Sequence, residues 1–185
     1  RGCLHPQNDW FLELDYNAAE VRTLLGLSGI TQPTGDIHQW NIQNIYDGKL
    51  DRRQAKQKIF EWLYSDKENE KAAAFYDKNL VKEKYWDGSN IHTEFGRDIK
   101  GVDNHHALSY IVQSTTSDLV LNKAVEIHEW LREKESAIAF MMHDSIVIDL
   151  KHDERELIPE LMKIFGTTSF GDYKVNVALG KNFGD

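Results

Sequence analysis

The chain has 185 residues, 41% of them hydrophobic, and a formal net charge of −8. This length and composition predict a globular domain with a real core and exclude a disordered chain. The single cysteine, Cys3, excludes an internal disulfide framework and a cysteine-rich zinc site, and it fits a reducing compartment. No apolar run approaches the roughly 20 residues of a membrane span and no signal peptide is visible, so we expect a cytoplasmic protein with no membrane partner.

The acidic charge bears on nucleic-acid binding. Taken alone, it argues against such binding, because contacts to phosphate need Lys and Arg. Acidic side chains are concentrated at 66–70 and 152–156, which we expect to be solvated and distant from any site. The first residue is Arg1 rather than Met, so we expect a fragment, a processed piece or one part of a split protein.

Hydrophobic periodicity and turn residues predict the following elements in chain order. A strand at 9–16 ends at Asp15-Tyr16, and a helix at 18–27 is closed by Ser28-Gly29. Asp36 is expected to cap a helix at 37–46, which is followed by an amphipathic helix at 51–64, a mostly polar helix at 66–84, a loop with a short strand at 86–101 and a long helix at 104–132. Strands at 136–142 and 145–150 flank a His-Asp-Ser turn, and a helix at 153–165 and a strand near 173–179 complete the chain.

Strands lie at both ends of this order, with helices between them. The pattern is typical of the α+β class, in which a sheet-based platform carries an inserted helical lobe.

Two aspartates stand at the ends of expected strands. Asp15 ends the first strand, and Asp144 lies in the turn between the strands at 136–142 and 145–150. If these strands are neighbours, the carboxylates converge on a rigid support, where they suit Mg²⁺. A pair of such ions clamps the attacking and leaving oxygens of phosphoryl transfer. The alternative is that each aspartate only stabilises a turn or caps a helix.

The helix at 51–64 carries a row of side chains at steps of four, namely Arg52, Lys56, Phe60 and Tyr64. Because a helix has about 3.6 residues per turn, the row stays on one broad face. Cations at its start suit a triphosphate, and aromatic rings at its end suit a base. An ordinary amphipathic helix with solvated cations is the alternative. His38 is a further candidate for a phosphate contact, and a structural histidine is the alternative there.

Seven stretches, in order, resemble the polymerase domain of family A DNA polymerases, the DNA polymerase I type. They are LELDYNAAEVR (12–22, similar to motif A), DIH (36–38), RRQAKQKIFEWLY (52–64, similar to motif B on the O helix), TEFGR (93–97), YIVQSTTSDLV (110–120), MMHDSIVID (141–149, similar to motif C) and VNVALGKNFGD (175–185). The resemblance implies template-directed DNA synthesis by a right-hand polymerase, with a palm built on an antiparallel sheet and a helical fingers insertion.

The resemblance also implies a domain organisation. It places the palm at 1–30 and 104–185 and the fingers at 31–103, with the O helix at 51–64. We expect the thumb and the exonuclease-like domain to be absent from this chain and to be supplied by an N-terminal segment or a separate chain. The shortened stretch between Tyr64 and Gln113 looks viral, which suggests a phage protein in the cytoplasm of a bacterial host.

The roles of family residues carry over to matching positions. Asp15 and Asp144 would be the carboxylates that hold two Mg²⁺ ions, with the Tyr16 backbone carbonyl helping one of them. Lys56 would bind the triphosphate and help to protonate the leaving pyrophosphate, and Glu20 would exclude a ribose 2′-OH.

The remaining roles concern dNTP and primer-template DNA. Arg52 and His38 would hold the triphosphate with Lys56, Phe60 would lie by the sugar, Tyr64 would stack near the templating base, Gln113 would read the minor groove, His143 would support the primer terminus, and Arg97, in the T-x-x-G-R turn, would contact DNA.

The sequence departs from the family pattern at several positions. Ser145 stands where motif C usually has Glu, so the supporting role of that carboxylate is missing or filled by a hydroxyl. Ser109, His105 and Ser114 stand where Asn, Arg and Gly are usual, which puts the minor-groove contacts in doubt.

Two other functions stay open on sequence grounds. A single-subunit, phage-type RNA polymerase shares the palm, and its motif C often reads HDS, but Glu20 and Phe60 favour deoxynucleotides. A non-catalytic replication scaffold is the other alternative, and the intact Asp15, Asp144 and Lys56 argue against it.

Overall fold

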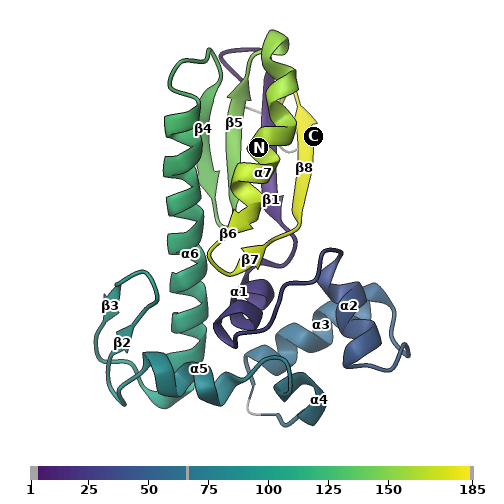
Figure 1. Ribbon diagram of the computed structural model, residues 1–185, viewed down its shortest axis with the longest axis vertical. Helices are drawn as coiled ribbons and strands as arrows, with labels where there is room; N and C mark the ends of the chain where they lie inside the picture. The colour runs from purple at the N-terminus through teal and green to yellow at the C-terminus, as the bar shows by residue number, and fades with distance from the viewer. Residues whose placement is uncertain (1–3, 66, 184–185) are drawn as a thin grey trace. The chain divides into compact units, whose positions relative to one another are not determined.

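The computed structural model describes residues 4–65 and 67–183, which form two compact units. We call residues 4–17, 117–168 and 173–183 the sheet unit, and residues 18–65, 67–116 and 169–172 the helical unit. The order of elements along the chain can be followed in Figure 1. This combination of an antiparallel sheet with a largely helical unit confirms the predicted α+β class.

The sheet unit is built on four antiparallel strands in the order β4-β5-β1-β8. Their bounds are β1 Trp10–Tyr16, β4 Ala137–Met142, β5 Ser145–Leu150 and β8 Val175–Gly180. β1 is therefore a central strand, with β5 on one side and β8 on the other. Leu12 and Leu14, which alternate along β1, are fully buried, as expected for a strand with one face in the core.

Helix α7 (Ile158–Gly166) packs against β1 and β8 and lies across the sheet in Figure 1. Its Phe165 ring stacks on Tyr16 with a centroid distance of 4.0 Å, and the Tyr16 hydroxyl donates a hydrogen bond to the Phe165 carbonyl at 2.6 Å.

The predicted helix at 153–165 is only partly correct. Residues His152–Leu157 form the 3₁₀ helix η1, and Pro159 lies in the first turn of α7, where a missing N–H is tolerated.

The helical unit contains α1 (Ala19–Leu27), α2 (Ile37–Asn44) and α3 (Arg52–Leu63), and both α1 and α2 contact α3. Local capping explains where they begin and end. Asp36 caps α2 as predicted, and Asp51 forms a capping box with Gln54 at the start of α3. The chain leaves α1 through Gly29, whose φ of 75° suits glycine.

The predicted helix at 66–84 is wrong as a single helix, and its first residue lies outside the described part of the chain. Two short helices occupy this stretch, α4 (Glu70–Ala73) and α5 (Lys78–Tyr85). The side chains of Asn69 and Asp77 each accept a backbone hydrogen bond that starts a new helix. Between them Tyr76 is buried, and its hydroxyl donates to Asn41 at 2.7 Å.

The remaining elements are short, except for one long helix. β2 (Ile91–His92) pairs with β3 (Asp98–Ile99), and β6 (Thr167–Thr168) and β7 (Gly171–Asp172) were not predicted. Helix α6 (Asn104–Trp130) confirms the predicted long helix, and the boundary between the units falls within it, after Thr116. No helix in the described part of the chain is both long and apolar enough to cross a membrane.

The helical unit buries a histidine, His38, which is only 1% exposed. Its ring lies 6.3 Å from that of Phe60, and its Nδ1 has no hydrogen-bond partner among the described residues. Burial is the main cause that lowers the pKa of His38 to about 4; Asp36 opposes it, and the nearby cations Arg52 and Lys56 add to it. The imidazole is therefore neutral at pH 7.

This burial predicts a pH-dependent stability. The folded pKa of His38 is lower than the ordinary value of 6.5, so the unfolded chain binds the proton more tightly. The contribution of neutral, buried His38 to the free energy of unfolding is fully present above pH 6.5 and is lost as the pH falls toward 4. Between pH 7.5 and pH 5, we expect wild type to lose about 2 kcal/mol more unfolding free energy than His38→Gln. Urea denaturation at both pH values measures this difference, and equal losses in the two proteins would contradict it.

Candidate active site

The sheet unit brings the two predicted metal carboxylates to the same end of two neighbouring strands. In the ladder between β1 and β5, Asp15 lies opposite Ser145, the residue that follows Asp144. Residues opposite each other in an antiparallel pair have Cα atoms about 4.5–5.5 Å apart. Asp15 and Asp144 are both half-buried, so their oxygens are within reach of solvent. The strands that carry them are neighbours, as the sequence interpretation required.

The hairpin that carries Asp144 is tight. Met142 pairs with Ser145, so only His143 and Asp144 lie in the turn. His143 is exposed and has a φ of 54°, a left-handed conformation that is uncommon outside glycine. The Ser145 hydroxyl donates to the Met142 carbonyl at 3.0 Å, which closes the turn from within. The turn conformation therefore fixes the backbone position from which the Asp144 side chain extends.

Neighbouring strands also support Asp15 and Tyr16. The Asn176 amide, on β8, donates to the Asp15 carboxylate at 3.2 Å. Tyr16 is held by its stacking on Phe165, and burial raises the pKa of its phenol, which stays protonated. The side chain of Tyr16 thus anchors the end of β1, and a metal contact would fall to its backbone carbonyl.

The donor set fits a hard cation such as Mg²⁺, although it is small. Asp15 and Asp144 supply carboxylate oxygens, and Tyr16 supplies a carbonyl, which are the ligand types that Mg²⁺ prefers. Within residues 4–65 and 67–183, no three His, Cys, Asp or Glu side chains converge closely enough to hold a metal ion. Proteins commonly bind Mg²⁺ through one or two carboxylates together with substrate phosphates, so a small set is not a disagreement.

In the helical unit, some side chains of the predicted row on α3 contact other residues and others face solvent. The Arg52 guanidinium donates to the Asp36 carboxylate, and Lys56 is exposed. Phe60 is half-buried against the core of the unit. The row therefore starts with two accessible cations and ends in aromatic rings, as the sequence pattern indicated.

The far end of α3 meets the segment that follows β1. Tyr64 is 39% exposed, and its hydroxyl donates a hydrogen bond to the Glu20 carboxylate. Glu20 lies in the first turn of α1. The two residues, 44 positions apart in the sequence, thus form one hydrogen-bonded pair in the helical unit.

The structure places the other predicted DNA contacts on separate elements of the same unit. Gln113 is exposed on α6. Arg97 is exposed where the turn after Thr93 enters β3, and its backbone N–H is held by the Thr93 hydroxyl at 3.0 Å. Both side chains are therefore on the surface, where a nucleic acid can reach them.

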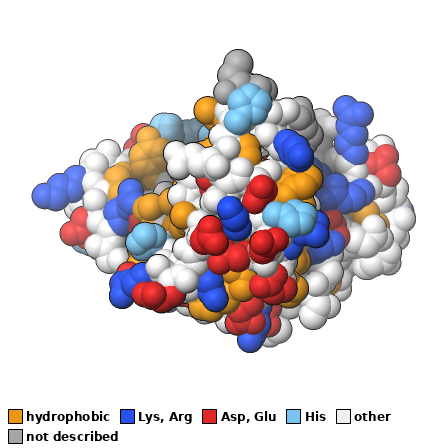
Figure 2. Space-filling model, turned by 90° about the horizontal axis from the view of Figure 1, so that it is seen from above, with side chains coloured by type: hydrophobic (Ala, Val, Ile, Leu, Met, Phe, Trp, Pro, Cys, Tyr) orange, Lys and Arg blue, Asp and Glu red, His pale blue; other side chains and the backbone are white. Residues whose placement is uncertain are grey.

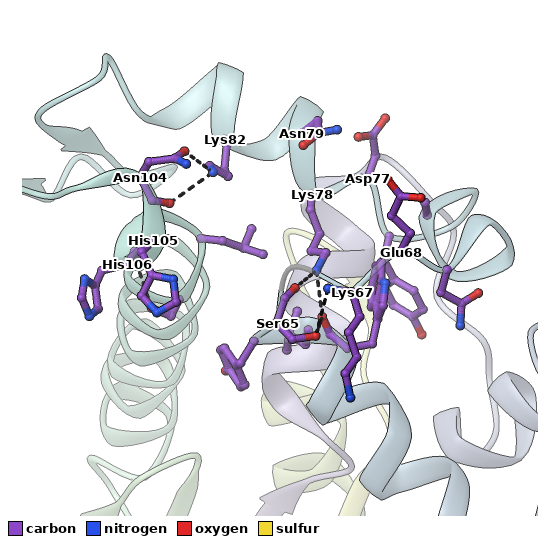
Figure 3. A pocket seen from close by; sticks show the side chains of 18 of the residues that line it. Ser65, Lys67, Glu68, Asp77, Lys78, Asn79, Lys82, Asn104, His105 and His106 are labelled. Atoms are coloured by element: carbon purple, nitrogen blue, oxygen red, sulfur yellow. Dashed lines mark hydrogen bonds between the residues drawn. The ribbon is translucent and has the colours of Figure 1, made fainter.

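A cavity of about 570 Å³ lies beside the end of α3 (Figure 3). Tyr64 and the start of α6, including His105, are among its lining residues. Lys78 points into the region and donates to the carbonyls of Trp62 and Ser65, at 2.7 and 2.8 Å. Trp62 lies in the last turn of α3 and Ser65 follows its C-terminal cap, Tyr64, so a cation is favourable at this helix end.

Sequence reasoning missed three supporting residues. Asn176 contacts Asp15, Lys78 holds the end of α3, and Asp36 holds Arg52 in addition to capping α2. Only Asp36 carried a sequence signal, as an expected helix cap. The other contacts join residues that no local pattern links.

Known proteins resemble this chain in sequence and in fold. No protein-family model matches the chain. The DNA polymerase of Bacillus phage SP01 is 32% identical over 92 residues, which cover 43% of this chain and 10% of that protein. The POL domain of Pol1 from M. smegmatis, in a complex with DNA primer-template and dNTP, matches 98% of this chain and 41% of that chain with a TM-score of 0.73 and 14% identity.

The chain thus spans about a tenth of the phage protein and about two fifths of the mycobacterial chain. One match rests on sequence and the other on fold. The predicted resemblance to polymerases is thus confirmed as a resemblance: part of the chain is similar in sequence to a phage DNA polymerase, and its fold is similar to that of the POL domain of Pol1 from M. smegmatis.

Proposed function

We propose that this chain is the catalytic part of a DNA-directed DNA polymerase, in which a primer 3′-OH attacks the α-phosphate of a dNTP and pyrophosphate leaves. The observation that carries this proposal is the strand register that sets Asp15 opposite the residue next to Asp144. Two carboxylates at one strand end, on a rigid sheet, are suited to a reaction that depends on placement and charge neutralisation.

In the sheet unit, Asp15, Asp144 and the Tyr16 carbonyl would hold two Mg²⁺ ions. When bound, these ions would neutralise charge on the attacking and leaving oxygens. Asn176 orients the Asp15 carboxylate through its hydrogen bond, and the His143 turn fixes the backbone of Asp144. His143 is exposed, so its ring is accessible to a primer terminus.

In the helical unit, the cations at the start of α3 would bind the triphosphate. Arg52 and Lys56 are both exposed, and Lys56 would assist the departure of pyrophosphate. His38 is the third predicted phosphate partner, and it is buried and neutral. As a neutral imidazole it can donate one hydrogen bond to a phosphate, provided that its neighbours move to uncover it.

Sugar and base would meet the other end of α3. The Tyr64 hydroxyl holds the Glu20 carboxylate, so this acidic group has a defined position from which it can exclude a ribose 2′-OH. Phe60 would lie by the sugar, and the half-exposed Tyr64 ring offers a face for the templating base. This arrangement favours deoxynucleotides over ribonucleotides.

Primer-template DNA would contact Gln113 and Arg97. In this proposal the palm comprises residues 1–30 and 104–185, and the fingers comprise residues 31–103. Acidic and basic side chains lie close together near the centre of the face seen in Figure 2. A thumb, carried with an exonuclease domain on an N-terminal segment or a separate chain, would supply further grip on the duplex. We place the enzyme in the cytoplasm of a bacterial host.

Asp144→Ala should abolish primer extension, by at least about 10³-fold, because one of the two metal carboxylates is lost. Asp153→Ala, which removes an exposed carboxylate from η1 in the same unit, should retain wild-type extension. Extension is measured with Mg²⁺, dNTPs and primer-template, for the chain alone and mixed with a thumb segment. Circular dichroism shows that each variant is folded. Full activity in a folded Asp144→Ala protein would sink the assignment of this carboxylate.

Glu20→Ala should admit ribonucleotides, because it removes the carboxylate that would oppose a 2′-OH. We expect the ratio of rNTP to dNTP incorporation to rise by about 10²-fold. Tyr64→Phe is the matched control, because it removes the hydrogen bond to Glu20 but leaves the carboxylate in place. It should change the ratio much less. Unchanged sugar selection in Glu20→Ala would show that the gate lies elsewhere, and efficient rNTP use by wild type would favour an RNA polymerase.

A further inference from the structure

The carboxylate of Asp36 connects two helices of the helical unit. Its Oδ1 accepts the backbone N–H groups of His38 and Gln39, at 2.9 and 3.1 Å, and so caps α2. Its Oδ2 accepts from Nε and a terminal nitrogen of Arg52, at 3.1 and 2.7 Å. One side chain therefore fixes the start of α2 and the direction of the first cation on α3.

The support of Asp36 is rigid. The fully buried guanidinium of Arg22 donates to the carbonyls of Pro33 and Gly35, at 3.1 and 2.6 Å, in the turn that leads directly into Asp36. The Asp36 side chain is 18% exposed, whereas that of Arg52 is 56% exposed. An anchored carboxylate thus holds a long side chain that would otherwise move freely in solvent.

We propose that Asp36 is a positioning residue that presets Arg52 for the triphosphate of an incoming nucleotide. This inference rests on the proposed function, in which Arg52 binds that triphosphate. A guanidinium has five N–H donors in a fixed plane, and Asp36 uses only one edge of it. The other donors remain for phosphate oxygens, and the rotamer freedom of Arg52 is already reduced before the nucleotide arrives.

The sign of one measurement separates this role from simple electrostatics. If Asp36 acted only as a nearby negative charge, its neutralisation would strengthen the binding of an anionic triphosphate. If Asp36 positions Arg52, its neutralisation releases the guanidinium and weakens that binding. The two expectations are opposite, so the direction of change is decisive.

Asp36→Asn is the informative variant. Asn caps helices as well as Asp does, so α2 should keep its start, while the amide no longer pairs with a guanidinium. Asp36→Ser, which also caps, carries the test if Asp36→Asn does not fold. Asp77→Asn is the matched control, because the Asp77 carboxylate caps α5 by accepting from Leu80 at 2.9 Å. Circular dichroism and urea denaturation compare the folds.

Two readouts are measured on the full chain, the dissociation constant for dATP by calorimetry and the steady-state constants of primer extension. Asp36→Asn should raise the Kd for dATP and the KM for dNTP by about three- to tenfold and change kcat by less than about twofold. In an Arg52→Gln background, the same substitution should change the Kd by less than about twofold. Asp77→Asn should match wild type.

The outcomes separate the inference from the proposed function. Unchanged or tighter dATP binding by Asp36→Asn, with wild type active in extension, would overturn the positioning role alone. Weaker binding by Asp36→Asn in a chain that never extends a primer would support the positioning role and overturn the polymerase activity. A wild-type chain that neither binds dATP nor extends a primer would overturn both.

Discussion

The register of β1 is the constraint on which the candidate site depends. β1 pairs with β5 and with β8 over six residues each, so it cannot slip without breaking two ladders. A slip of one residue would also turn the buried Leu12 and Leu14 outward, which makes the register strongly specified. That register sets Asp15 opposite Ser145 and beside Asn176. The position of the Asp15 carboxylate is thus secured by hydrophobic burial farther along the same strand.

In the helical unit, a hydrogen-bonded network around a buried arginine has the corresponding role. Arg22 is fully buried, and a buried guanidinium is tolerated only when its donors are satisfied. Backbone carbonyls of the turn at 33–35 accept from it, and Gln32 donates back to the Arg22 carbonyl at 2.9 Å. This network orders a loop that has no regular structure of its own. The ordered loop holds Asp36 where it can cap α2 and bond to Arg52 on α3. The buried Arg22 therefore helps, through this loop, to fix the position of the accessible cation Arg52.

Features with a local cause could be predicted from the sequence, and features that depend on packing could not. The end of β1, the hairpin turn at 143–144 and the cap at Asp36 follow from alternation and from side chains that bond their own backbone. The broken helix at 66–84 was missed because Tyr76 is drawn into the core and bonds to Asn41, 35 residues earlier. The pair between Asp36 and Arg52 likewise requires α2 to pack on α3, which no pattern in either segment states.

The candidate site has few carboxylates, and Ser145 stands beside one of them, Asp144. Glutamate at this position would add a third acidic group, but serine is 2% exposed and its hydroxyl is already bonded to the Met142 carbonyl. Ser145 therefore stabilises the turn. The protein's own donors then amount to the carboxylates of Asp15 and Asp144 and a carbonyl. Because so small a set of protein ligands holds a divalent cation weakly, occupancy of the sheet unit by Mg²⁺ would depend on phosphate oxygens that complete the coordination.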